Sequence, residues 1–178
     1  MRPSACFAFT LCIALAAAPV AAQRNQRDTL TPAQVEKIRE AGIDPPGRVK
    51  LYTQFVDEHV DTIKALAKRA HSAARAHQMD NELQDLAALM DEFSDNLDVY
   101  SDRKADIRKS LKPLAEATKR WQATLREIPS EPGFDLSLKD ATASSKDLAD
   151  EAASMLTEQT AYFKIHKDER YQQREEPK

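Results

Sequence analysis

Apolar residues recur at every third or fourth position over residues 83–128, and this stripe is the most regular pattern in the chain. A spacing of three and four places all of its members on one face of an α-helix. The stripe therefore predicts one unbroken helix over about residues 80–128, roughly 70 Å long at about 1.5 Å per residue. All of its members except Lys104 and Thr118 are apolar, and the full set is Leu83, Leu86, Met90, Phe93, Leu97, Tyr100, Lys104, Ile107, Leu111, Leu114, Thr118, Trp121, Leu125 and Ile128.

Three further helices are predicted on either side of the long one, over residues 31–42, 45–78 and 135–166. At the start of the first, Thr31 and Gln34 have the spacing of a capping box, and Pro32 occupies the first turn, where its missing N–H is not needed. The second helix has an apolar seam flanked by more apolar residues, which suits a bundle better than a two-stranded coil. That seam is Val49, Tyr52, Val56, His59, Ile63, Leu66, Ala70, Ala73 and His77.

These elements predict an all-α fold, namely an elongated antiparallel bundle of three long helices plus a short N-terminal helix, with coiled-coil-like seams. Asp80 or Asn81 is expected to cap the long helix. Pro113 is the residue most able to interrupt this helix. Because it lies opposite the stripe, we expect a kink rather than a turn. The alternative is a compact four-helix bundle, which would result from a break near residues 101–104 or at Pro113.

The N-terminus has the form of a secretory signal peptide. Arg2 precedes an apolar run over residues 6–18, which is shorter than a membrane span, and the small residues Val20 and Ala22 suit a cleavage site. We therefore predict a signal peptide over residues 1–22, export to the periplasm or the extracellular space, and no membrane span in the mature chain. Residues 23–29 are expected to be flexible, 30–166 to form one domain, and 167–178 to be a polar disordered tail.

Cleavage would remove both cysteines, Cys6 and Cys12, so the mature chain is expected to form no disulfide. The whole chain has 26 basic and 29 acidic residues, and only Arg2 among them lies in the predicted signal peptide. The mature chain is therefore acidic overall, which argues against nucleic acid as a partner.

Charge divides the predicted long helix into two halves. Residues 80–102 contain eight acidic residues and no basic one, whereas residues 103–126 contain eight basic and two acidic residues. The end of the second helix is basic and the start of the fourth is acidic, so antiparallel neighbours could match these halves within one chain. The same pattern also permits an antiparallel dimer of two copies, or binding of an acidic partner or phosphate-bearing polymer by the basic half.

The residues of both halves that we predict as a candidate interaction surface are charged and lie off the apolar stripe. Four aspartates recur along one side of the acidic half and are expected to face solvent. The full candidate set is Arg103, Arg108, Lys109, Lys112, Lys119, Arg120, Asp91, Asp95, Asp98 and Asp102.

Residues with catalytic spacing are not apparent, and we predict that the protein is not an enzyme and has no cofactor. No Ser/His/Asp order, phosphate-cradling glycine loop or His-Glu-x-x-His motif stands out. A helical metal pair needs ligands three or four residues apart, a spacing that the histidines lack, and metal or haem binding through them remains an alternative. The four histidines are His59, His71, His77 and His166.

The segment Leu30-Thr31-Pro32-Ala33-Gln34 resembles the Leu-Thr-x-x-Gln motif of small helical periplasmic stress proteins of the Spy and CpxP type. The resemblance covers these five residues. It implies a periplasmic chaperone or stress-sensor adaptor that exposes a concave apolar and basic surface.

The sequence as a whole predicts a non-enzymatic extracytoplasmic helical protein that acts by protein–protein interaction or as a structural module. Its expected partner is an unidentified protein or a second copy. The amphipathic helices, the charge division and the missing catalytic motifs lead to this prediction, with the chaperone and the histidine-based metal or haem protein as alternatives.

Overall fold

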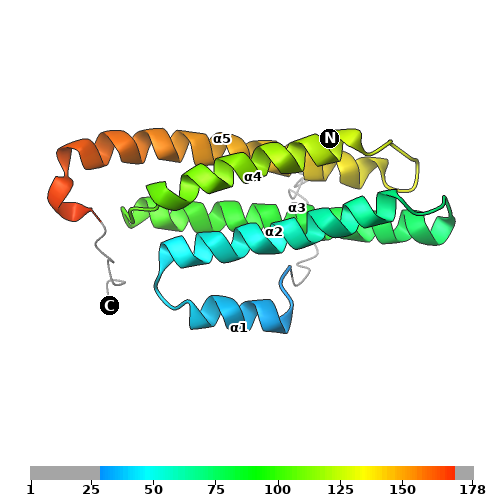
Figure 1. Cartoon of the computed structure of the whole chain (residues 1–178), viewed down its shortest axis with the longest axis horizontal. Coiled ribbons are helices and arrows are strands. Elements are labelled where there is room, and N and C mark those ends of the chain that lie inside the picture. The colour runs from blue at the N-terminus through cyan, green and yellow to red at the C-terminus, as the bar shows by residue number, and fades with distance from the viewer. Residues whose placement is uncertain (1–28, 171–178) are drawn as a thin grey trace, which may run out of the picture.

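The computed structural model describes residues 29–170, and these residues are predominantly helical. The predicted all-α bundle is therefore confirmed, whereas the predicted signal peptide lies outside the described residues. Figure 1 shows the elements in order, which are α1 (Pro32–Glu40), α2 (Pro45–Ala67), α3 (Ala73–Asp102), α4 (Arg108–Glu127), α5 (Asp135–Ile165) and the short 3₁₀-helix η1 (Lys167–Glu169).

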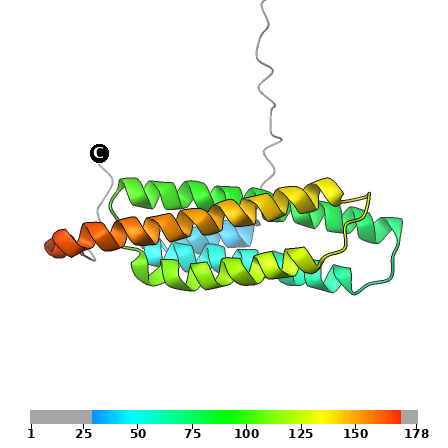
Figure 2. The same ribbon diagram turned by 90° about the horizontal axis from the view of Figure 1, so that it is seen from above.

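Helices α2 to α5 form a four-helix bundle, and α1 lies against the outer side of α2 (Figure 1). Because short turns join successive bundle helices, each is antiparallel to the next. Both α3 and α4 pack against α2 and α5, but within residues 29–170 they do not pack against each other. Figure 2 shows α5 running between them. Helices α3 and α4 thus occupy opposite corners of the bundle, and the neighbours α3–α5 and α2–α4 are parallel pairs.

The apolar stripe forms the centre of the core. Every one of its members except Lys104 is buried, including Thr118, whose hydroxyl donates to the backbone carbonyl of Ala115 at 3.0 Å. The residues that the stripe assigned to the core are therefore correct, although the helix that carries them is not continuous.

The prediction of one unbroken helix is wrong, because α3 ends at Asp102 and α4 begins at Arg108. The compact four-helix bundle, predicted as the alternative, describes the fold. The stripe keeps its phase across the turn because Tyr100 and Ile107, on either side, are both buried. Periodicity alone therefore could not distinguish the turn from a continued helix.

The end of α3 is a Schellman motif in which Lys104 takes the left-handed position that glycine usually occupies, with φ 53°. The N–H of Ala105 donates to the carbonyl of Tyr100, and the N–H of Lys104 donates to the carbonyl of Ser101, both at 3.0 Å. These bonds satisfy carbonyls that the end of a helix leaves without partners.

The side chain of Gln159, on α5, holds the other side of the turn. Its Oε1 accepts from the N–H of Ile107 at 3.1 Å, and its Nε2 donates to the carbonyl of Ala105 at 2.9 Å. Both bonds are buried, so they replace pairing that these backbone groups would otherwise lack. The turn is thus held by a residue far along the chain.

Pro113 is exposed and lies inside α4, which continues through it. The prediction that Pro113 would not reverse the chain is confirmed. The turn lies instead within residues 103–107, where glycine and proline are both absent.

The second helix is also shorter than predicted, because α2 ends at Ala67 and the next helix begins after Ser72. The Ser72 hydroxyl accepts from the N–H of Arg75 at 3.1 Å and caps α3. The predicted caps Asp80 and Asn81 are wrong, since both lie inside α3. The last predicted seam positions are consequently exposed, namely Ala70, Ala73 and His77.

The prediction for the start of the described chain is confirmed, whereas the prediction for its last residues is partly wrong. The capping box of Thr31 and Gln34 is confirmed, with the N–H of Gln34 donating to the Thr31 hydroxyl at 3.3 Å and the N–H of Thr31 donating to Gln34 Oε1 at 2.8 Å. The predicted fourth helix matches α5. The polar tail expected from Lys167 is wrong at its start, because Lys167–Glu169 forms η1.

Candidate functional site

The predicted acidic positions of α3 lie beside α5, which is itself acidic. Glu151 of α5 accepts a hydrogen bond from the Ser94 hydroxyl of α3, and its other oxygen is buried without a partner. Burial, together with the negative charges of Asp98 and Asp95, raises the pKa of Glu151 to about 7. The α3–α5 side of the bundle therefore concentrates carboxylates that repel one another.

The other two predicted aspartates of α3, Asp91 and Asp102, lie on either side of Asp95 and Asp98 along the helix. Asp91 is half-buried, and Asp102, the last residue of α3, is exposed like Asp95 and Asp98. We call these four α3 residues the acidic ladder. The expected solvent exposure of the ladder is confirmed for three of them.

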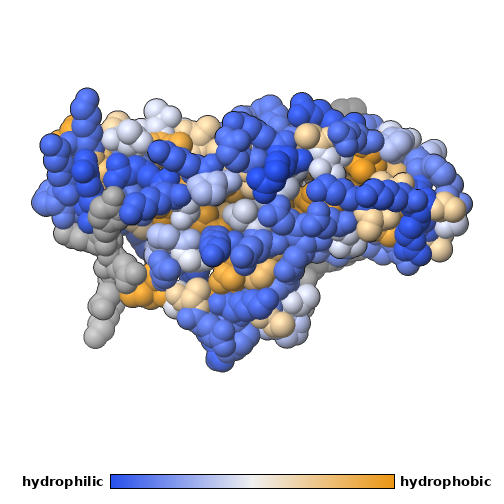
Figure 3. Space-filling model, viewed as in Figure 1, coloured by the Kyte–Doolittle hydropathy of each residue, from blue (hydrophilic) through white to orange (hydrophobic). Residues whose placement is uncertain are grey.

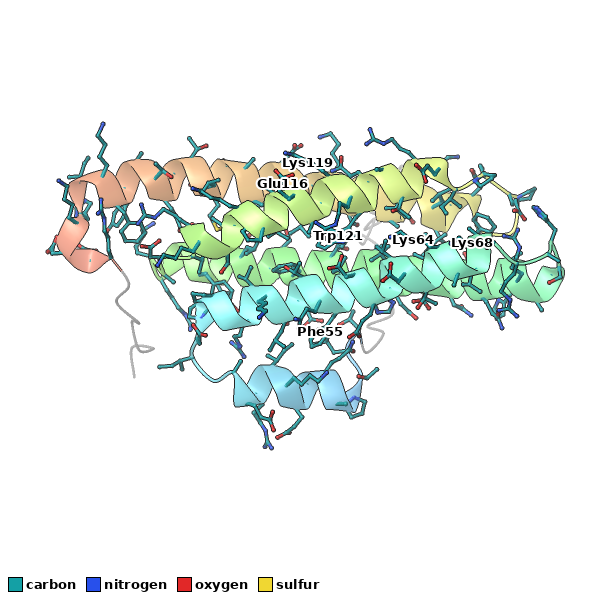
Figure 4. All side chains as sticks on the ribbon, viewed as in Figure 1. Phe55, Lys64, Lys68, Glu116, Lys119 and Trp121 are labelled. Carbon is teal, nitrogen blue, oxygen red and sulfur yellow. The ribbon has the colours of Figure 1, made fainter. Side chains whose placement is uncertain are left out.

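The basic candidates of the second half lie mainly on α4, and Figure 4 shows one of them, Lys119, on the side of α4 away from α2. Lys119 pairs with Glu116 of the same helix at 2.8 Å, and Arg120 approaches Asp57 of α2 at 3.6 Å. Asp57 also accepts from the buried Trp121 indole at 2.6 Å, which ties α4 to α2. Both basic side chains remain largely exposed.

The helix neighbours predicted for the two charge halves are present, because α3 packs against α2 and α4 packs against α5, and several ion pairs lie within a single helix. Lys64 pairs with Asp61 in α2 at 3.1 Å, and Lys146 pairs with Asp150 in α5 at 2.5 Å. Parallel packing of α3 against α5 in addition places acidic segments side by side. The basic candidates of α4 are Arg108, Lys109, Lys112, Lys119 and Arg120, and we call them the basic face of α4. Because α3 and α4 do not pack together, the acidic ladder and this basic face stay apart.

Three basic candidates meet in a cleft of about 470 Å³ where α4 begins and α5 ends. Arg108 is fixed by Asp106, with Nε and Nη2 each 2.8 Å from a carboxylate oxygen, and its guanidinium lies 4.8 Å from the centre of the Phe163 ring. The hydrogen bonds and charge of Arg108, opposed by burial, lower the pKa of Asp106. The cleft is lined by Asp106, Arg108, Lys109, Lys112, Leu156, Thr160 and Arg170.

Arg170 is a cleft residue that the sequence analysis missed, because it was assigned to the disordered tail. Its Nε and Nη2 donate to the backbone carbonyl of Phe163 at 2.8 and 2.6 Å. Glu151 was missed as well, because the sequence analysis considered only the overall acidic character of the start of its helix. Arg103, the remaining basic candidate, lies in the turn and does not line the cleft.

The histidines lie on separate elements and show no shared site. His59 Nδ1 is 2.7 Å from Glu82 at a cleft of about 480 Å³ between the start of α1 and helices α2 and α3. His71 precedes α3, whereas His77 lies in α3 and His166 follows α5. Among residues 29–170, no three or more His, Cys, Asp or Glu side chains are placed to hold a metal ion.

The surface is mainly hydrophilic on the face shown in Figure 3, with apolar residues in small separate patches. Phe55 is buried between α2 and α1 (Figure 4), so α1 covers part of the outer side of α2. Within the described part of the chain, none of the helices has both the length and the apolar character of a membrane span.

Comparison of the chain with protein families, curated proteins and solved structures finds no match. The Leu-Thr-x-x-Gln segment has a local role that its residues explain, since Thr31 and Gln34 cap α1 and Gln34 Nε2 donates to Glu58 of α2 at 3.1 Å.

Proposed function

We propose that this chain is an exported, non-enzymatic interaction module that associates through its charged helix faces, and that a second copy is its first partner. The observation that carries the proposal is that α3, which bears the acidic ladder, and α4, which bears most of the basic candidates, do not pack against each other within residues 29–170. In that arrangement the two charge blocks do not pair with each other, and exposed members such as Asp98 and Lys119 can meet a complementary surface.

The position of the two faces favours a particular geometry of association. An isologous dimer needs both complementary patches within one interface. Faces at opposite corners instead suit head-to-tail contact, in which the ladder of one copy meets α4 of the next. Export is supported by the signal-like pattern of residues 1–22.

The first experiment measures self-association by sedimentation velocity at low and high salt. We expect larger species at low salt that dissociate as salt rises, because exposed charges are screened beyond about 10 Å at 0.1 M. A chain that is monomeric at low salt over the whole concentration range contradicts self-association.

A charge-reversal pair makes the test specific. Asp95→Lys with Asp98→Lys reverses the ladder, and Lys119→Glu with Arg126→Glu reverses exposed positions of α4. Each double variant alone should be monomeric, whereas a mixture of the two should associate because one unaltered face of each kind remains. Failure of the mixture to associate contradicts the head-to-tail contact.

Crosslinking in the native envelope, followed by mass spectrometry, tests for other protein partners. The proposal expects crosslinks from Lys119 to an acidic surface of a second copy or another protein. Native samples that yield only crosslinks within one chain contradict an interaction module altogether.

A further inference from the structure

The cleft where α4 begins combines several sources of positive potential. Arg108, Lys109, Lys112 and Arg170 line it, and Asp106 is the single acidic residue among the lining side chains of the described chain. The start of a helix adds a partial positive charge and N–H groups that point away from the helix. The electrostatic character of the cleft is therefore strongly cationic.

This concentration of charge works against the stability of α4. Basic residues near a helix N-terminus oppose the helix dipole, which favours acidic residues there. The first turn of α4 has no acidic residue and no side-chain cap on Ile107. The charges of Lys109 and Lys112 thus do not favour the dipole of α4, whereas their positions suit the binding of an anion.

The two arginines are held in fixed positions before any ligand arrives. Asp106 and the Phe163 ring hold the Arg108 guanidinium, and the carbonyl of Phe163 holds that of Arg170. Such prior ordering lowers the entropy cost of binding. The two lysines, which are exposed, supply compact charges that can close on a ligand from the rim.

We propose that this cleft binds a phosphate group carried by a small molecule or by a lipid headgroup. A phosphate ester bears about −1.5 to −2 charges at neutral pH and three acceptor oxygens, which fits several cations better than a single carboxylate does. The volume of about 470 Å³ leaves room for the group attached to the phosphate. This inference is independent of association between protein copies, because its ligand and its residues Lys109, Lys112 and Arg170 differ from those tested above.

The experiment titrates the full mature chain with pyrophosphate by calorimetry at constant ionic strength, and a second arm measures co-sedimentation with phosphatidic acid vesicles. The test variant is Lys109→Gln with Lys112→Gln. The matched control is Lys64→Gln with Lys68→Gln, a pair of exposed lysines at the opposite end of the bundle (Figure 4). Circular dichroism checks that both variants fold.

We expect saturable binding that weakens about tenfold in the test variant and stays within about twofold in the control. Binding of pyrophosphate identifies a soluble source of the phosphate, and binding of vesicles alone identifies a headgroup. Absence of binding in both arms overturns the proposal, as does an equal loss in both variants, which would reflect net charge. A polyglutamate peptide that binds where both phosphate probes fail would also overturn it.

Discussion

Residues 103–107 and Pro113 lie in the same part of the apolar stripe, yet the helix ends at the first and continues through the second. Residues 103–107 contain neither glycine nor proline. A proline inside a helix, by contrast, lacks an N–H donor and crowds the preceding turn. Local propensity therefore favours a break at Pro113, and the structure places it elsewhere.

Tertiary contacts explain the difference. At the turn, buried Gln159 pairs with the backbone of Ala105 and Ile107, so ending the helix leaves these groups satisfied. Pro113 is exposed, and so is Lys109, whose carbonyl loses its helical donor, so water can replace the lost bond. The comparison teaches that the availability of partners for freed backbone groups decides where this stripe is interrupted.

The largest effect is expected from Gln159→Leu, which removes the side-chain hydrogen bonds that hold the turn. It leaves the Ile107 N–H and the Ala105 carbonyl buried without partners, at a cost of about 3 kcal/mol in the free energy of unfolding. Urea denaturation measures the loss. Gln122→Leu is the control, because the Gln122 amide makes one half-buried bond to a backbone carbonyl, at 3.2 Å, and should cost about 1 kcal/mol or less. Equal losses would contradict a special role for the turn.

Asp106→Asn should weaken the same turn by about 2 kcal/mol, since it removes the charge that pairs with Arg108. The lowered pKa of Asp106 gives the sign of the pH effect. The stabilisation is complete above the unfolded pKa of about 4 and is lost as pH falls through the lower folded pKa. Unfolding measured from pH 7 to pH 2 should show a steeper acid loss in the unaltered chain than in the variant. Asp102→Asn, at an exposed position, should leave the acid loss unchanged.

Pro113→Ala tests how much the proline inside α4 costs. It restores a helical N–H and relieves crowding, so we expect a gain of about 1–2 kcal/mol, below the full cost of an interior proline because this site is exposed. Thermal unfolding followed by circular dichroism measures the gain. An unchanged midpoint would mean that α4 carries no cost at Pro113.

The α3–α5 side of the bundle, where Glu151 of α5 lies, should respond to pH in the opposite direction to Asp106. The pKa of Glu151 is raised to about 7, so stability should fall as pH rises from about 4.5 to about 7. Allowing for solvent screening of this partly buried group, the loss is about 1 kcal/mol. Urea unfolding at several pH values measures it, and Glu151→Gln should flatten the slope. A slope that persists in that variant must come from other groups.

The smallest effect is expected from Lys104→Gly, which removes a non-glycine residue from φ 53°. The variant should gain about 0.5–1 kcal/mol by relieving the left-handed conformation. The contact of Lys104 Nζ with the Tyr162 ring, at 5.9 Å from its centre, is lost and offsets part of this gain. Lys104→Ala separates the two, since it loses the contact and keeps the strain. A glycine variant no more stable than the alanine variant would contradict this reasoning.

The sequence predicts the buried residues of the bundle better than its helix boundaries. Burial follows from periodicity, so the stripe identifies core positions such as Phe93 and Trp121 on both sides of the turn. The exception, Lys104, was the one local sign of the break, but Thr118 interrupts the stripe equally and is buried. Distinguishing them requires the position of Gln159, which the local pattern does not contain.

The candidate surfaces were likewise predicted only in part, because some of their residues come from distant parts of the chain. Exposure of the ladder follows from its phase on α3, and the basic character of the segment that follows is evident from composition. Their neighbours depend on packing, because the diagonal placement of α3 and α4 brings Glu151 to the ladder and Arg170 to the basic cleft. The missed residues are therefore those contributed by α5 and the segment after it.

The bond between Gln159 and the turn also orders events during synthesis. A ribosome completes residues 73–127 before it adds Gln159, so the partner of Ala105 and Ile107 emerges only when most of α5 has been made. Until then, the continuous periodicity of the stripe is the local information that the nascent segment carries. The native corner between α3 and α4 can acquire its buried hydrogen bonds only after Gln159 has been added to the chain.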